Sequence, residues 1–389
     1  MLYLPLLCAN VLLMDNSDNI PAQNPNTPLS PDNASTPVSP PPAPKKTHEM
    51  PNKWLVFGGL AVLIIVTAGC LWALKKPAAQ PVAVSYTHTI PASPPSTKTE
   101  GLQLDPTKNY GNKYSSGLLP VGDGKYSSAA PAAGTVYTCS TYAQNLASSK
   151  GGASTRGPWF TNNNTQYDIN KKVHVQGSVM WQAEFSNNVS GATRTIVTND
   201  LPSHPTGVFP ISASDPAYAY DRNPNKITGQ TMTYALNASP TYTATPNCMG
   251  GQSGVMLTGV ALFNGFDAGG RDAGAWEVQD SCSGHPQSDG IYHYHTLSSC
   301  IKDISVKTVI GYALDGFPIT GPQVGTNNIL TTSDLDECHG LTSQIVLDGK
   351  NVTTYHYVMT QDFPYSISCF RSTAIQPPGQ AGGPPTQHP

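Results

Sequence analysis

A run of uncharged residues constrains this chain more than any other feature. Trp54 to Leu74 reads WLVFGGLAVLIIVTAGCLWAL. An α-helix of this length extends about 31 Å, which matches the hydrocarbon core of a bilayer. Lysines flank the run unevenly, an excess that favours a cytoplasmic N-terminus; they are Lys45, Lys46 and Lys53 before it and Lys75 and Lys76 after it. We predict a transmembrane helix over residues 54–74, with a buried helix of a soluble protein as the alternative.

The distribution of cysteines favours an exported C-terminal domain. Cys8 and Cys70 lie before or within the apolar run, and six cysteines follow it: Cys139, Cys248, Cys282, Cys300, Cys338 and Cys369. An even number on one side fits disulfides formed in an oxidising compartment. We therefore predict a single-pass cell-membrane protein whose C-terminal domain is extracytoplasmic. A lipoprotein cleavage box ending at Cys70 is the alternative, although Leu71 and Trp72 continue the apolar run past it.

Composition divides the rest of the chain. Residues 1–53 and 75–135 are rich in Pro, Ser, Thr and Asn, which predicts a disordered N-terminal tail and an extended stalk. Met14 is an alternative start codon. We expect one folded domain over residues 136–371 and a disordered tail over residues 372–389. The net charge is only −3 and no cluster of Lys and Arg extends beyond pairs, so we expect no nucleic-acid partner.

Alternating segments within residues 136–371 predict β-strands. KKVHVQGSVMWQAEF, MTYALNA, GVMLTGVALFNGF, VKTVIGYALDGFPI and TTYHYVMTQDF combine β-branched or aromatic residues with turn residues. No repeated alternation of strand and helix patterns occurs, which argues against a parallel α/β sheet. We predict a mainly β fold: a single disulfide-bonded, mostly antiparallel β domain that follows one transmembrane helix and a disordered stalk.

One predicted strand carries the tetrapeptide Tyr292-His293-Tyr294-His295. Because alternate side chains of a strand share a face, His293 and His295 would point one way and the tyrosines the other. Two imidazoles about 6.6 Å apart at their Cα atoms can converge on one metal ion. His356 and His285 are the candidates for further ligands, followed by Glu277 and Asp280. Imidazole ligands suit copper and zinc equally, so the sequence does not choose between them.

Other interpretations of these residues stay open. The two histidines could instead make hydrogen bonds within a polar patch of the fold. A metal-dependent enzyme would need a general base beside metal-bound water, and Glu277 could serve. The sequence shows no nucleophile elbow, phosphate-binding loop or dinucleotide fingerprint, so whether the chain is an enzyme is left open. The alternative of another class is a surface adhesion module that binds a glycan or protein, with a purely structural histidine strand.

A second stretch, TYHYVMTQDFPYSISC, echoes DGIYHYHTLSSC, with Val358 in place of the second histidine. We expect the two strands to lie side by side or to face one another. Six cysteines allow fifteen disulfide connectivities. We favour Cys282–Cys300, because that loop encloses the histidine strand, and Cys338–Cys369 by analogy, which leaves Cys139–Cys248.

The order of these motifs resembles the YHYH domain family. The segments that carry the resemblance are DAGGRDAGAWEVQDSCSGHPQSDGIYHYHTLSSC, IGYALDGFPITGP, DLDECHG and FPYSISCF, preceded by LPSHPTGVFPI and DPAYAYDRNPNKI. The resemblance implies an exported domain without an established reaction, in which His293, His295 and His356 belong to one feature. It also implies histidines where this chain has Trp276 and Val358. Together these observations predict a membrane-anchored YHYH domain that binds a transition metal, copper or zinc, through His293, His295, His356 and His285.

Overall fold

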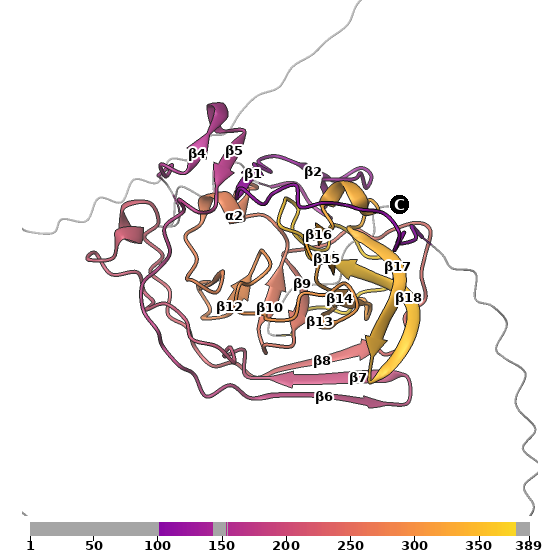
Figure 1. Ribbon diagram of the computed structural model, residues 1–389. Coiled ribbons are helices and arrows are strands. Elements are labelled where there is room, and N and C mark those ends of the chain that lie inside the picture. Colours follow the sequence, from indigo (N-terminus) through magenta and orange to yellow (C-terminus); the bar gives the residue numbers. More distant parts are fainter. Residues whose placement is uncertain (1–100, 143–152, 154, 379–389) are drawn as a thin grey trace, which may run out of the picture. The chain divides into compact units, whose positions relative to one another are not determined.

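Short strands joined by turns make up most of the structure, as β-branched and aromatic residues between Gly, Pro and Asn predict. A computed structural model describes residues 101–142, 153 and 155–378 (Figure 1). These residues all belong to Pro91–Pro389, one of the two units into which the chain divides. The mainly β part of the fold prediction agrees with this structure.

The largest sheet has eight strands and contains the histidine strand. Its order is β11-β12-β10-β9-β13-β14-β18-β17, and Figure 1 shows these strands following one another from β12 to β17. Neighbours are antiparallel except for two parallel pairs, β10 with β12 and β14 with β18. The strands are β9 (Gln252–Met256), β10 (Ala261–Phe263), β11 (Gly284–Pro286), β12 (Tyr292–Tyr294), β13 (Val309–Ala313), β14 (Pro318–Thr320), β17 (Gly340–Leu347) and β18 (Lys350–Val358). Every residue of the central β9 is buried, so both faces of the sheet are covered there.

A three-stranded antiparallel sheet packs against one face of the eight-stranded sheet. It consists of β6 (Phe185–Ser190), β7 (Thr193–Thr198) and β8 (Met232–Asn237). Burial alternates along β8, where Met232, Tyr234 and Leu236 are buried and the residues between them are exposed. This alternation is the period of a half-buried strand. The three side chains share one hydrophobic core with Val255 of β9 and Leu262 of β10.

Three smaller sheets, four short helical turns and a second core cluster complete the described fold. One sheet pairs β1 (Leu118–Pro120), β5 (Gln166–Asp168) and β4 (Phe160–Thr161); the others pair β2 (Tyr126–Ser127) with β3 (Val136–Tyr137), and β15 (Gln323–Gly325) with β16 (Asn328–Ile329). Short helical turns are η1 (Asn162–Asn164), η2 (Pro216–Ala219), α2 (Ala273–Trp276) and η3 (Thr332–Asp334). Trp159 and Tyr167 form a core cluster with Ala275 and Val278. This cluster fixes the segment around α2, which leads into the candidate site.

Three disulfides tie the domain together. They join Cys139 to Cys248, Cys282 to Cys300, and Cys338 to Cys369. Each of the three favoured pairings is therefore confirmed. The second bond closes a loop that contains β11 and β12, and the third closes a loop that contains β17 and β18.

The membrane part of the fold prediction is corrected. Within the described ranges, no helix has the length and apolar character needed to cross a bilayer. The longest helices there have four residues, whereas a spanning helix needs about 20. The predicted span over residues 54–74 lies outside the described residues. Neither a transmembrane helix before the β domain nor a single-pass membrane localisation is supported.

Two further expectations differ from the structure. The stalk was expected to extend to residue 135, but strands β1 and β2 lie within residues 101–135, so that boundary falls inside the fold. The first 26 residues of the predicted stalk, 75–100, and the N-terminal tail lie outside the described residues. The two Tyr-His-Tyr strands are not neighbours either, because β10, β9, β13 and β14 separate β12 from β18 in the sheet.

Candidate metal centre

The β11–β12 hairpin brings His285 opposite His293. These two residues are direct partners in the antiparallel register, so their side chains lie on the same face of the sheet. The connection contains Asp289-Gly290, in which Gly290 has a φ of 89° that other residues adopt at a cost. His295 follows β12 by one residue and returns to the face of His293. The imidazole centroids lie 4.5 Å (His285–His293) and 4.8 Å (His293–His295) apart.

The ligating nitrogens of this histidine cluster, His285, His293 and His295, converge. One nitrogen from each ring can be chosen so that all lie within 4.8 Å of one another, which is a spacing that can hold a metal ion. Nε2 of His293 lies 3.1 Å from Nε2 of His295. All three residues are buried, with at most 4% of each exposed.

Hydrogen bonds on the far side of two rings fix their tautomers. Nδ1 of His293 lies 3.2 Å from the carbonyl oxygen of Ile291, and Nδ1 of His295 lies 2.5 Å from that of Asn264. A carbonyl oxygen can only accept, so both Nδ1 atoms carry the proton. Each neutral ring therefore presents the lone pair of its Nε2. Holding the far nitrogen on a carbonyl is the usual way in which proteins orient a metal-binding histidine.

Glu277 brings a carboxylate to the same place. It is the C-cap of α2, whose N-cap Asp272 accepts a hydrogen bond from the backbone N–H of Ala275. Oε2 of Glu277 lies 3.4 Å from Nε2 of His295 and 3.5 Å from Nε2 of His285. Its side chain is 20% exposed, more than the histidines are.

Several polar atoms of the site are left without hydrogen bonds. Within the described part of the chain, Oε2 of Glu277 and both ring nitrogens of His285 are buried and have no hydrogen-bond partner. A buried polar group without a partner costs about 1–3 kcal/mol. Such groups in a native fold need an explanation, and a bound ion is one of the recognised explanations.

Burial sets the protonation states of the cluster. It lowers the pKa of His285 and His293 well below the usual histidine value, and the neighbouring imidazoles lower it further. It lowers the pKa of His295 to about 4. Burial and the nearby Asp267 and Asp221 raise the pKa of Glu277 well above its usual range. The histidines are thus neutral near pH 7, which is the form that binds metals.

The tyrosines of the tetrapeptide serve the fold on the other side of the strand. Tyr292 donates its hydroxyl hydrogen bond to Asp280, at 2.9 Å and 3.0 Å from the two carboxylate oxygens. Tyr294 makes a short hydrogen bond with Nε2 of His204 and contacts the hydroxyl of Thr258. Asp280 is therefore engaged with Tyr292. On the histidine side, the ring of Phe263 packs against His293 at 4.3 Å between centroids.

The structure separates one predicted ligand from the others. Nδ1 of His356 lies 2.9 Å from the hydroxyl of Thr320, and its Nε2 lies 2.8 Å from the hydroxyl of Ser343. Both ring nitrogens are thus engaged within the second half of the sheet. His285 takes the place expected for His356. A repeated Asp-x-Cys-x-Gly pattern before each Tyr-His-Tyr would have revealed this, because it aligns His356 with His293.

Two other residues near the cluster, Trp276 and His204, are held by structural contacts. Trp276, the last residue of α2, donates from its indole nitrogen to Asp123 and lies under the guanidinium of Arg271. His204 lies near Cys282 and Cys300 in a group with the spacing of a metal site. Those two sulfurs form a disulfide, so they offer no thiolate to an ion.

Comparison with known proteins identifies part of the chain. The model of the family described as "YHYH protein" matches residues 233–332. This range extends from β8 to η3 and contains the histidine cluster and Glu277, but not β18 and His356. No curated protein and no solved structure matches the chain.

Proposed function

We propose that this chain, in which a YHYH domain is present, binds one divalent transition metal ion, copper or zinc, in that domain. The ligands are Nε2 of His285, His293 and His295, and Oε2 of Glu277 completes the set. Three imidazoles and a carboxylate are a donor set that both ions accept. The proposal concerns binding, because the cluster is buried and no open coordination position is needed for it.

One contact carries the proposal. Two Nε2 atoms, on His293 and His295, lie 3.1 Å apart while both Nδ1 atoms face carbonyl oxygens. With the protons on Nδ1, neither ring can donate to the other, and two lone pairs point at each other. Burial keeps both rings neutral, so an additional proton is not the remedy at neutral pH. A cation between the nitrogens turns this repulsion into two coordinate bonds.

The spacing of the donor atoms agrees with this interpretation. Zn–N and Zn–O bonds of 2.0–2.1 Å in a tetrahedron place neighbouring ligand atoms about 3.3 Å apart. Three of the six separations among these donor atoms are 3.1 Å (His293–His295), 3.4 Å (Glu277–His295) and 3.5 Å (Glu277–His285). A bound cation would also favour the ionised form of Glu277 and give the buried Nε2 of His285 a partner.

Metal content tests the proposal. The full chain, purified without reductant, stripped with a chelator, reloaded with Zn²⁺ or Cu²⁺ and desalted, should retain about one equivalent of metal by mass spectrometry. Replacing His293 and His295 together with alanine should abolish retention. Circular dichroism of each metal-free protein establishes that the fold is kept.

Two matched variants discriminate between the possible third ligands. His285→Leu should lose the metal, whereas His356→Leu should keep it, because both ring nitrogens of His356 are engaged elsewhere. His174→Ala, at an exposed position, controls for adventitious binding to surface histidines. A folded wild-type chain without metal would refute the proposal and leave the adhesion module as the better interpretation.

A further inference from the structure

The eight-stranded sheet consists of two halves with the same connectivity. From the centre outward, the first half has the order β9, β10, β12, β11, and the second has β13, β14, β18, β17. In each half the first two strands form an antiparallel hairpin. The last two strands form a second antiparallel hairpin, which is β11–β12 in the first half and β17–β18 in the second. Its later strand in the chain, β12 or β18, runs parallel to β10 or β14 of the first hairpin.

The junction between the halves is symmetric at the level of single residues. Val255 of β9 pairs with Tyr312 of β13, and the pairs on either side are Gly254 with Ala313 and Met256 with Gly311. If Val255 corresponds to Tyr312, then Gly254 corresponds to Gly311 and Met256 corresponds to Ala313. A two-fold rotation about the central pair therefore exchanges the two flanking pairs. The backbone hydrogen bonds have the same two-fold symmetry. The N–H of Leu257 donates to the carbonyl of Ile310 at 2.9 Å, and the N–H of Leu314 donates to that of Ser253 at 2.9 Å.

The hairpin turns repeat in detail. Gly259 has a φ of 91° in the β9–β10 turn, and Gly316 has a φ of 93° in the β13–β14 turn. Each glycine N–H donates to the carbonyl three residues earlier, at 3.0 Å and 2.9 Å. Both hairpins also have a register irregularity at the same step, where Phe263 pairs with Gln252 and Thr320 with Val309.

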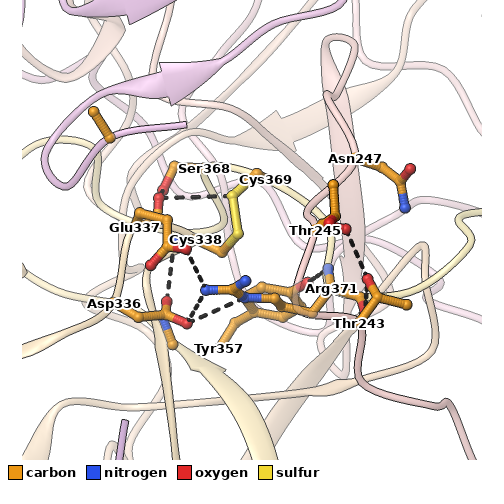
Figure 2. Close-up of a disulfide and its surroundings, with 12 residues drawn as sticks. Thr243, Thr245, Asn247, Asp336, Glu337, Cys338, Tyr357, Ser368, Cys369 and Arg371 are labelled. Atoms are coloured by element: carbon orange, nitrogen blue, oxygen red, sulfur yellow. Dashed lines mark hydrogen bonds and ion pairs between the residues drawn. A yellow bond between two sulfur atoms is a disulfide. The ribbon is translucent and has the colours of Figure 1, made fainter. Parts of the chain in front are cut away.

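The loop that enters the second hairpin is also duplicated. Its Asp-x-Cys-x-Gly pattern occurs as Asp280, Cys282 and Gly284 and again as Asp336, Cys338 and Gly340. In both loops the aspartate accepts from the backbone N–H of the cysteine, at 2.9 Å and 3.0 Å. Each cysteine forms a disulfide with a cysteine beyond the Tyr-His-Tyr strand. Figure 2 shows the second of these loops beside its disulfide.

The same aspartates receive equivalent tyrosines. Tyr292 donates to both carboxylate oxygens of Asp280, and Tyr355 donates to both of Asp336. A Cβ on Gly284 would meet the ring of Tyr292, and one on Gly340 would meet the ring of Tyr355. The two loops therefore need glycine for the same reason.

This correspondence assigns a counterpart to each histidine of the cluster. Register pairs His285 with His293 in the first half and Leu341 with His356 in the second. Val358 then corresponds to His295. Leu341 and Val358 belong to a separate hydrophobic cluster with Val306, Leu330 and Leu335. Where the first half gathers imidazoles, the second half gathers apolar side chains.

We propose that the sheet is an internal duplication in which the second half retains the scaffold of the metal site and has lost two of its three histidines. Leu341 and Val358 occupy the positions that correspond to His285 and His295. His356, the counterpart of His293, is the histidine that the second half retains. The metal part of this inference rests on the proposed function; the duplication rests on register and hydrogen bonds alone. The scaffold should therefore accept histidines at both positions as a second site.

Exchanging residues between the halves tests the inference. Leu341→His with Val358→His should raise retained Zn²⁺ from about one equivalent per chain to about two. His285→Leu with His295→Val should lower it to none while the domain stays folded, because the second half already accommodates these residues. All four substitutions together should return it to about one. Co²⁺, a coloured substitute for Zn²⁺, reports coordination by its visible absorption.

The outcomes separate this inference from the proposed function. A wild-type chain without metal contradicts the proposed function. In that case the folding of the double variant His285→Leu, His295→Val tests the duplication by itself. A folded Leu341→His, Val358→His protein that retains only one equivalent overturns the inference. If that protein does not fold, the reverse exchange decides: its unfolding would show that the halves are not interchangeable.

Discussion

Replacing Arg371 with methionine is expected to lower the free energy of unfolding by about 3–5 kcal/mol, because it leaves a buried charge without its partner. The guanidinium is 3% exposed and lies 2.8 Å from Oδ2 of Asp336, whose side chain is 7% exposed. It also lies 2.8 Å from Oε1 of Glu337. Figure 2 shows Arg371 lying between these carboxylates and Thr243. Urea unfolding of the two proteins at equal pH measures the difference.

The effect should depend on pH. Burial raises the pKa of the Asp336 carboxyl above its ordinary 3.8, and Arg371 opposes that rise. Without Arg371, the pKa of Asp336 in the folded state rises further. A raised folded pKa contributes stability that is fully present below the unfolded pKa and is lost as pH rises through the folded one. The deficit of the variant should therefore be smaller near pH 4 than near pH 8.

An exposed ion pair provides the matched control. Nζ of Lys171 lies 3.1 Å from Asp168, but the lysine side chain is 66% exposed. Lys171→Ala should change the free energy of unfolding by about 0–1 kcal/mol, since water screens such a pair. If Arg371→Met costs no more than Lys171→Ala at pH 8, the Arg371 pair does not stabilise the loop closed by the Cys338–Cys369 disulfide.

The parts of the fold that the sequence predicts are those determined by local patterns. Alternation identified most of the strands, although KKVHVQGSVMWQAEF forms only isolated bridges at Val175 and Val179 before β6 begins at Phe185. Period-two geometry placed His293 and His295 on one face. The Cys282–Cys300 pairing followed from a loop that encloses a strand, the Cys338–Cys369 pairing followed by analogy, and Cys139 and Cys248 were the two that remained. The inferences on the strands and on Cys282–Cys300 succeed because each depends on residues close together in the chain, where strand geometry leaves few alternatives.

The third ligand required information that local patterns do not hold. His356 is favoured by the sequence because its motif repeats that of His293. A repeated motif, however, can mark equivalent positions in two parts of a fold and not residues in contact. In the sheet, the parallel pairs β10–β12 and β14–β18 give each half its own Tyr-His-Tyr strand. Strand register places His285 opposite His293, and this register is fixed only when the β11–β12 hairpin forms.

Composition also misplaced the start of the fold. Residues 101–135 are rich in Gly, Ser and Pro, which resembles a stalk. In the structure they are held by tertiary contacts, such as the backbone N–H of Leu104 donating to Thr342 and that of Gly122 donating to Asp272. Segments with few apolar residues can still be ordered when a larger core supplies partners for their backbone.

Glu277→Gln should separate the stability of the metal-free domain from the stability that a metal adds. Glutamine is close in shape and removes a carboxyl whose pKa burial raises well above its usual range, so the metal-free variant should be as stable as wild type or more stable. An ion at 1,000 times its Kd stabilises a domain by about 4.1 kcal/mol. Losing the carboxylate ligand should weaken binding by about 100-fold, which removes about 2.7 kcal/mol of that gain.

Unfolding with and without Zn²⁺ measures both quantities. Wild type and Glu184→Gln, which alters an exposed carboxylate, should show the full stabilisation by metal, and His285→Leu should show none. A reduced gain in Glu277→Gln, with a metal-free stability that is unchanged or higher, makes Glu277 a ligand. If Glu277→Gln keeps the full gain while His285→Leu loses it, the three imidazoles hold the ion without Glu277. In that case a water molecule or another donor occupies the fourth position, and the centre belongs to the open type, in which metal-bound water can react.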